Sequence, residues 1–150
     1  PDIPPNAGTL IRLGACLGVP IDIIEPCGFH WDDRDLKRAA MDYGARADVT
    51  RHASWETFAG MRDMGSRLVL LTTKTTRSFV DFSFEPADIL LIGRESAGVP
   101  DDIHAGADAA VTIPMRPPAR SLNMAVAASM VLAEALRQTG GFPATAPAGK

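Results

Sequence analysis

The sequence has 150 residues, of which 46% are hydrophobic and 22% charged, and its formal net charge is −3 at pH 7. These values predict one globular domain, because a chain of this length buries roughly two-thirds of the surface that it exposes when unfolded. They exclude a chain that is disordered over its whole length. No apolar run approaches the roughly 20 residues that are needed to span a bilayer. The acidic balance does not exclude a nucleic acid as partner, since a local basic patch can coexist with it.

The ends of the chain and its cysteines and histidines carry little chemistry of their own. Residues 1–4 lack the charged and apolar regions of a secretion signal. The two cysteines form no motif, and the three histidines are too far apart for a local metal site: Cys16, Cys27, His30, His52 and His104. We therefore expect an intracellular, cytoplasmic protein that holds no metal.

Apolar runs alternate along the chain with stretches of helical periodicity, which is the pattern of parallel strands joined by crossover helices. It predicts, in chain order, a helix over 6–17, a strand over 21–24, a helix over 33–42, a weaker strand over 49–52, a helix over 54–64, strands over 67–72, 87–93 and 109–115, and a helix over 121–139. Helix N-caps are expected at Asp32, Ser54 and Ser121. The predicted fold class is α/β with a parallel sheet.

The last helix is the most apolar element. Its hydrophobic residues occupy more than one face, namely Leu122, Val126, Met130, Leu132 and Leu136. Such a helix is either deeply buried or shared with a partner subunit. Residues 1–8 read as a loop with no strand before them, so we expect a short native strand to precede Pro1. Residues 142–150 are rich in proline, alanine and glycine and predict a flexible tail.

The first cluster with chemical potential lies at the start of the chain. Asn6 and Arg12 are six positions apart, so on one continuous helix they would point to different sides. A loop-borne Asn6 and a helical Arg12 could instead meet at one ligand. The alternative for Arg12 is an ordinary solvated charge.

The second cluster follows the apolar run 89–92, at the carboxyl end of a strand, where open α/β sheets bind ligands. It contains Glu95 between Gly93 and Gly98. The dinucleotide fingerprint and the P-loop are absent, and Ser96 does not stand at the position of a nucleophile elbow. A purely structural turn explains this cluster equally well.

The third cluster runs from Ile113 through a polar loop into Ser121, Leu122 and Asn123 at the start of the last helix. A helix N-terminus suits a carboxylate or a phosphate, although Ser121 could also be only the N-cap. Basic residues near the three clusters could neutralise phosphates, although each taken singly is more simply a surface charge: Arg34, Lys37, Arg38, Lys74, Arg77, Arg116 and Arg120.

Taken in order, the three clusters resemble the three motifs of the SpoU family of RNA 2′-O-ribose methyltransferases, within the SPOUT superfamily. The pattern is most similar to the small subfamily that methylates the wobble nucleotide, position 34, of leucine tRNAs. The matching segments cover nearly the whole chain: residues 3–6, 24–26, 28–29, 32–33, 36–43, 71–74 and 120–123. The family's first strand has no match before Pro1, and the tail after Gly141 has none either.

The resemblance implies a single SPOUT-type domain over residues 1–141 with a parallel sheet and a C-terminal trefoil knot, which would be an exception to the rule that connections do not thread loops. It also implies a homodimer that packs through the last helix. The implied cofactor is S-adenosylmethionine, bound at Leu71, Gly93, Ile113, Ser121 and Leu122. The implied catalytic residues are Asn6, Arg12, Glu95, Ser121 and Asn123.

The implied substrate is the anticodon stem-loop of a tRNA, with backbone contacts expected from Lys37, Arg38, Arg116 and Arg120. In the family, the residue that matches Arg12 is proposed to deprotonate the ribose hydroxyl. A guanidinium keeps its proton at neutral pH, so clamping a phosphate and stabilising the developing alkoxide is the other role that chemistry allows. Two other functions stay open: a SpoU-type enzyme for ribosomal RNA or another tRNA position, and a non-catalytic knotted RNA-binding protein.

Overall fold

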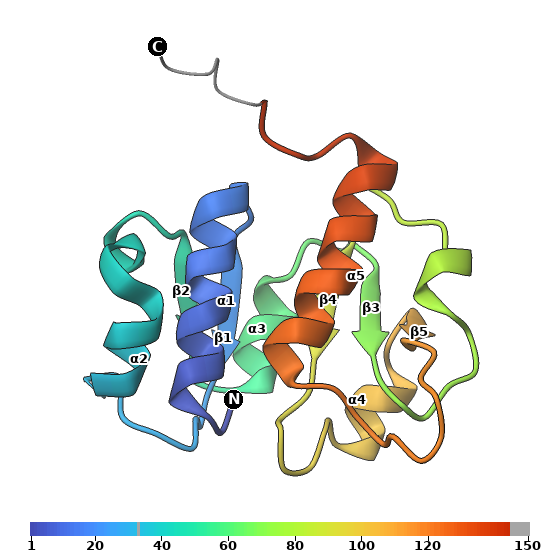
Figure 1. Ribbon diagram of the computed structural model, residues 1–150, viewed down its shortest axis with the longest axis horizontal. Helices are drawn as coiled ribbons and strands as arrows, with labels where there is room; N and C mark the ends of the chain where they lie inside the picture. Colours follow the sequence, from blue (N-terminus) through green and yellow to red (C-terminus); the bar gives the residue numbers. More distant parts are fainter. Residues whose placement is uncertain (33, 145–150) are drawn as a thin grey trace.

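The computed structural model describes residues 1–32 and 34–144 (Figure 1). Its elements are α1 (Pro4–Leu17), β1 (Ile21–Ile24), α2 (Arg34–Ala40), η1 (Met41–Ala45), β2 (Val49–His52), α3 (Trp55–Met61), β3 (Leu68–Leu71), η2 (Phe79–Asp81), β4 (Ile89–Ile92), α4 (Asp101–Ala105), β5 (Ala109–Val111) and α5 (Met124–Thr139). Every strand pair is parallel, which confirms the predicted α/β class. None of the described helices has the length and apolarity needed to cross a membrane.

The strands form two sheets among the described residues, where the sequence pattern predicted one. β1 pairs with β2, and the order of the second sheet is β4-β3-β5. In Figure 1 the first pair lies with α1 and α2 on one side of the molecule, and the second sheet lies behind α5 on the other. The carboxyl ends of β3, β4 and β5 therefore meet at one edge.

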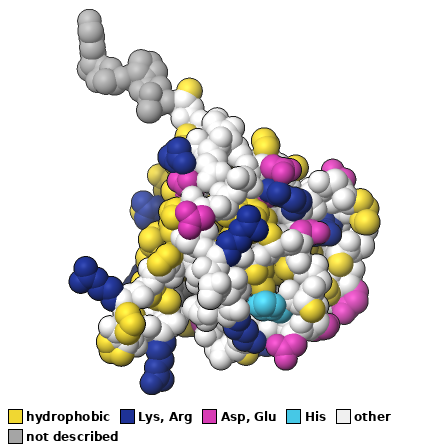
Figure 2. All heavy atoms as spheres, turned by 90° about the vertical axis from the view of Figure 1, so that its right-hand side faces the viewer, with side chains coloured by type: hydrophobic (Ala, Val, Ile, Leu, Met, Phe, Trp, Pro, Cys, Tyr) yellow, Lys and Arg dark blue, Asp and Glu magenta, His cyan; other side chains and the backbone are white. Residues whose placement is uncertain are grey.

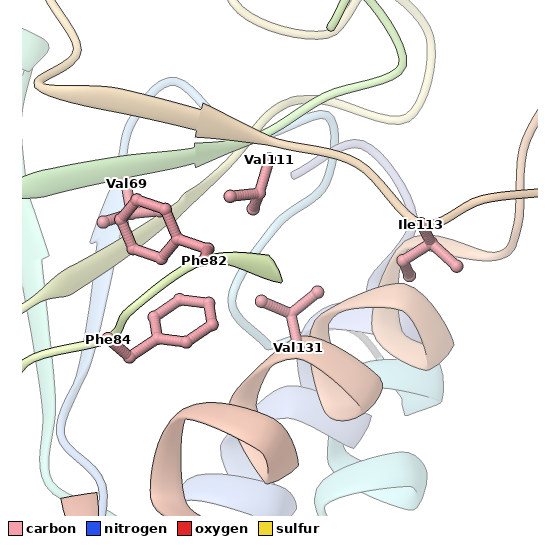
Figure 3. Packing of buried hydrophobic residues seen from close by; sticks show 6 residues of the cluster. All are labelled: Val69, Phe82, Phe84, Val111, Ile113 and Val131. Atoms are coloured by element: carbon pink, nitrogen blue, oxygen red, sulfur yellow. The ribbon is translucent and has the colours of Figure 1, made fainter. Parts of the chain in front are cut away.

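The central strand β3 is buried on both faces, which explains its continuous apolar run. Val69 points to one face, where it packs in a cluster with Phe82, Phe84, Val111, Ile113 and Val131 (Figure 3). Leu68 and Leu70 belong to a second cluster on the other face, with Phe58 of α3. α5 and α3 thus cover opposite faces and fix the edge at which β3 ends.

Helix α1 begins at Pro4, two residues before the predicted start, so Asn6 belongs to the helix and not to a loop. A proline is compatible with the first helical turn because its missing N–H would have no partner there. Gly8 packs against α2 so closely that an added Cβ would lie 2.5 Å from the Leu36 carbonyl oxygen. The helix ends at Gly18, whose φ of 68° is the left-handed conformation that glycine tolerates.

Helix α5 begins at Met124, three residues after the predicted start. Its N-cap is Asn123, whose side-chain oxygen accepts from the N–H groups of Ala125 and Val126 at 2.9 and 3.2 Å. The predicted Ser121 cap is therefore wrong, and Ser121 stays free for another role. The predicted Ser54 cap of α3 is confirmed, since its hydroxyl accepts from the Thr57 N–H.

Short elements account for the other differences from the predicted pattern. The helices η1, η2 and α4 have at most five residues each, which is too short for a periodic signal. α3 ends at Met61, because Arg62 adopts an extended conformation. Asp33, the predicted start of the second helix, and residues 145–150 of the predicted tail lie outside the described residues.

Candidate functional site

A cavity of about 440 Å³ lies at the carboxyl ends of β3 and β4 and beneath the start of α5. Residues from all three sequence clusters line it, although the chain separates them by more than a hundred positions. The predicted site residues among them are Asn6, Leu71, Gly93, Glu95, Ile113, Ser121, Leu122 and Asn123. The fold thus brings together all of the predicted cofactor-binding residues and all of the predicted catalytic residues except Arg12.

A chain of hydrogen bonds connects three of these residues at one end of the cavity. The Asn6 amide donates to Glu95 Oε1 at 3.0 Å, and the Asn123 amide donates to Asn6 Oδ1 at 2.9 Å. Asn6 is 7% exposed, so both of its bonds are largely shielded from water. Because Asn123 also caps α5, the network joins α1, the segment after β4 and the start of α5 into one unit.

Glu95 is a charged acceptor within this network. Partial burial raises the pKa of Glu95, but hydrogen bonds from the Asp2 N–H and from the Asn6 amide outweigh that effect, and the net pKa lies below the ordinary glutamate value. The carboxylate is therefore ionised at neutral pH, and its charge is lost only as the pH falls through this lowered pKa. It can accept hydrogen bonds from a ligand or attract a positive group.

The segment 93–98 is a closed turn as well as part of the cavity wall. The Arg94 and Gly98 backbones bond reciprocally, at 2.9 and 2.8 Å. A Cβ on Gly93 would lie 2.5 Å from the Gly98 carbonyl carbon, and Gly98 has a φ of 70°. The backbone conformation of the turn thus requires glycine at both positions. The cluster is a structural turn and also part of the cavity wall, so the two interpretations of it are compatible.

Arg12 does not line the cavity. It is exposed on the other side of α1, where its guanidinium donates to Met41 Sδ at 3.0 Å and lies 5.3 Å from the centre of the Tyr43 ring. Asn6, by contrast, faces Glu95 and Asn123. Of the two arrangements that the sequence allowed, a single copy of the chain has the one in which Asn6 and Arg12 lie on one continuous helix and point to different sides.

The four predicted RNA contacts form two separate exposed groups. Lys37 and Arg38 lie on α2, whereas Arg116 and Arg120 lie in the loop between β5 and α5. Within the described part of the chain, none of the four belongs to an ion pair. Figure 2 shows that, on the face it presents, Lys and Arg side chains are dispersed among acidic ones and not gathered in one patch.

The structure adds lining residues that the sequence analysis did not assign to the site. Thr72, Lys74, His104 and Met115 line the same cavity. The Nε2 atom of His104 is buried without a hydrogen-bond partner among the described residues. Lys74 follows the carboxyl end of β3 and is one of the basic residues that the sequence places near the three clusters. His104 lies on a five-residue helix, which is too short to give a periodic sequence pattern.

The cavity suits a nucleoside-sized organic molecule. Its volume falls within the roughly 300–1,000 Å³ that is typical of small-molecule sites. Leu71, Ile92 and Ile113 offer apolar surface, and backbone groups of the turn at Gly93 and the carboxylate of Glu95 offer polar contacts. Among the described residues there is no group of three or more His, Cys, Asp or Glu side chains that could hold a metal ion.

Known proteins share both the sequence pattern and the fold. The model of the SpoU rRNA Methylase family matches residues 1–133. A tRNA (cytidine(34)-2′-O)-methyltransferase of Beijerinckia indica is 59% identical over 143 residues, which cover 95% of this chain and 89% of that protein. A solved structure that concerns 2-OH methylation of C/U34 on tRNA superposes with a TM-score of 0.88 at 38% identity, covering 92% and 90% of the two chains.

A further solved structure bears on the cofactor. An AdoMet-bound rRNA methyltransferase from Sinorhizobium meliloti is similar to this chain, with a TM-score of 0.81 and 28% identity. The similarity covers 90% of this chain and 52% of that larger chain.

Proposed function

The chain belongs to the SpoU rRNA methylase family, and from this premise we propose that it is a tRNA methyltransferase that modifies the ribose 2′-hydroxyl of the wobble nucleotide, position 34. The observation that carries the proposal is the joining of three family motifs around one cavity by the Glu95–Asn6–Asn123 hydrogen bonds. The methyl donor is S-adenosylmethionine, in line with the AdoMet-bound relative.

The residues of the cavity fit this cofactor. Leu71, Ile92 and Ile113 provide an apolar surface for the adenine ring, and the Glu95 carboxylate provides a negative charge for a positively charged sulfonium. S-adenosylmethionine, when bound, supplies a methyl group from that sulfonium. Gly93, through its backbone, and Leu122, through its side chain, form further parts of the cavity wall.

Methyl transfer to a hydroxyl is an in-line displacement, so orientation is the main task of the chain's own residues. The ribose oxygen must come within roughly 3–3.5 Å of the methyl carbon and lose its proton. Ser121, freed from capping by Asn123, offers a hydroxyl for the ribose. Asn6 and Asn123 keep Glu95 in one orientation. Arg12 either accepts the ribose proton, for which its guanidinium must first lose its own, or clamps the adjacent phosphate and stabilises the alkoxide while the proton passes to water.

We propose that the chain acts as a homodimer that packs through α5. Val126 and Met130 lie one turn apart on α5 and are 51% and 41% exposed, which leaves an apolar strip uncovered in one copy. An apolar groove of about 620 Å³ lies along another face of α5 and is lined by Leu10 and Leu132 among others. Arg12 lies away from the cavity of its own chain. In the proposed dimer, each copy would therefore supply its Arg12 to the cavity of the other copy.

Finer features of the proposal follow the family resemblance. They are a single domain over residues 1–141 with a C-terminal trefoil knot, leucine tRNAs as substrates, recognition of the anticodon stem-loop, and a cytoplasmic location where tRNA is available.

Methyl transfer from labelled S-adenosylmethionine to total RNA tests the proposal. We expect the label in tRNA, and ribose-methylation mapping should find it at position 34. Label in ribosomal RNA or at another tRNA position would support the alternative SpoU-type enzyme. Cofactor binding by calorimetry without any transfer would support a non-catalytic RNA-binding protein.

A further inference from the structure

The turn that carries Glu95 is held from outside by one acidic residue, Asp2. The Asp2 Oδ1 atom accepts from Arg94 Nε at 2.9 Å and from Arg94 Nη2 at 2.6 Å. The Oδ2 atom accepts from the Ser96 N–H at 3.2 Å and from the Ser96 hydroxyl at 2.5 Å. The Asp2 N–H donates to Glu95 Oε2 at 2.7 Å. One residue therefore contacts three consecutive residues of the turn.

Asp2 is itself held on the opposite side, by the segment that follows β1. The Gly28 N–H donates to the Pro1 carbonyl oxygen at 2.9 Å. A Cβ on Gly28 would lie 2.9 Å from the Asp2 Cα, so the two backbones are in direct contact. Asp2 consequently connects the segment after β1 with the turn after β4, which belongs to the other sheet.

Asp2 also supplies one of the two donors that bind the Glu95 carboxylate. Glu95 Oε1 accepts from Asn6 and Oε2 accepts from the Asp2 N–H, so both carboxylate oxygens have a fixed donor. The backbone bonds between Arg94 and Gly98 keep the turn closed, but they do not orient it against α1. The bonds from Arg94 and Ser96 to Asp2 supply that orientation. Asp2 is 17% exposed at its side chain, whereas Arg94 is 51% exposed.

We propose that Asp2 is a positioning residue, which orients the 94–96 segment so that Glu95 faces the cofactor cavity. This inference rests on the proposed function, because it assigns Asp2 a purpose in the same site. The charge state is suitable: hydrogen bonds from Arg94 and Ser96 hold the pKa of Asp2 well below its usual range, so the carboxylate persists at neutral pH. Asp2 touches neither substrate nor cofactor in this account, and acts through Glu95.

The Asp2→Asn variant tests the inference. It keeps the size of the side chain but removes the charge and turns one acceptor into a donor that faces Arg94 or Ser96. We expect the Kd for S-adenosylmethionine to rise and kcat to fall about tenfold, the scale of one hydrogen bond to a charged group, with KM for tRNA and the Tm nearly unchanged. The matched control is Glu85→Gln, which removes one carboxylate of the surface ion pair with Arg67 and should leave all four quantities unchanged.

A charge swap separates positioning from a general loss of structure. Asp2→Arg combined with Arg94→Asp restores an ion pair of opposite direction, and we expect it to recover most of the lost cofactor affinity. Wild-type affinity and rate in Asp2→Asn, or a swap no better than the single variants, would overturn the inference. If the wild-type chain transfers no methyl group to tRNA, the proposed function fails, while the cofactor Kd still decides the role of Asp2.

Discussion

Asn6 and Asn123 connect the site because a carboxamide both donates and accepts. Asn6 donates to Glu95 and accepts from Asn123, while Asn123 donates to Asn6 and accepts from the first N–H groups of α5. An aspartate at either position would lose the donor and add a charge near Glu95. Leaving the buried Asn6 amide without a partner would typically cost about 1–3 kcal/mol. The amide is thus the side chain that suits a junction between an ionised carboxylate and a helix start.

Arg12 is the residue whose replacement separates chemistry from cofactor binding. Because it lies outside the cavity of its own chain, we expect Arg12→Ala to abolish methyl transfer and leave the Kd for S-adenosylmethionine nearly unchanged. Arg12→Lys should be almost as inactive, since a point charge does not replace a planar fork. Single-turnover rates measure methyl transfer, and calorimetry measures cofactor binding. The control is Arg62→Ala, which removes an arginine that pairs with Asp108. Wild-type rates in both Arg12 variants would refute the role.

Replacement of Gly93 should have the opposite effect to replacement of Arg12, because it should weaken cofactor binding directly. A Cβ at this position would lie 2.5 Å from the Gly98 backbone, which cannot move without opening the turn. We therefore expect Gly93→Val to weaken cofactor binding by at least about tenfold, through displacement of the cavity wall. Gly60→Val is the matched control, because nothing lies within 4 Å of a Cβ there. Normal cofactor affinity in a folded Gly93→Val protein would contradict the assigned cavity.

At the scale of elements, α5 contributes its start to the site and its exposed apolar strip to the proposed dimer. Its buried residues include Ala128, Val131 and Leu136, of which Val131 packs with Val69 and Val111 of the sheet, whereas Val126 and Met130 stay exposed. We expect Val126→Asp or Met130→Asp to convert a dimer into monomers at micromolar concentration, because a buried unpaired carboxylate is costly at an interface. Sedimentation measures the change, and Val80→Asp, at a valine that is 56% exposed on η2, is the control. A wild-type monomer with full activity would refute the dimer.

The sequence predicts the larger elements because each leaves a local signal. The buried run 68–71, the Ser54 cap and the apolar periodicity of the last helix are readable without tertiary contacts. The start of α5 was misplaced because Ser121 and Asn123 can both cap a helix, and the bond from Asn123 to Asn6 belongs to the tertiary structure. Local pattern alone pointed to the carboxyl ends of strands as a site; the family resemblance supplied the individual residues.

Two features of the site do not follow from the three sequence clusters. Asp2 contacts Arg94 and Ser96, more than ninety positions away, and a single aspartate in a proline-rich segment does not indicate such a pairing. The direction of Arg12 depends on whether Asn6 starts a helix or ends a loop, and Pro4 at the first turn decided that question. Pairing across long separations depends on packing that the pattern of residues does not encode.

At the scale of the whole molecule, an acidic protein must bind an acidic RNA. Its net charge of −3 gives no general attraction, so we expect binding to depend on dispersed exposed cations, with Lys37 and Arg120 as the predicted contacts. We expect tRNA affinity to fall steeply with salt, and Arg120→Ala to reduce the slope of log affinity against log salt by roughly one. Binding titrations at several salt concentrations measure this. An unchanged slope, as expected for the control Arg62→Ala, would exclude Arg120 as a phosphate contact.

The central claim is that the chain methylates a ribose hydroxyl at the wobble nucleotide. The anticodon loop is single-stranded and can expose that nucleotide to a cavity that a base-paired nucleotide could not enter. The most direct measurement compares labelled methyl transfer to a leucine tRNA that carries ribose at position 34 with transfer to the same RNA that carries 2′-deoxyribose there. A tRNA with deoxyribose at a neighbouring position is the control. We expect transfer to the ribose form and to the control, and none to the 34-deoxy form; equal incorporation into all three would contradict the account.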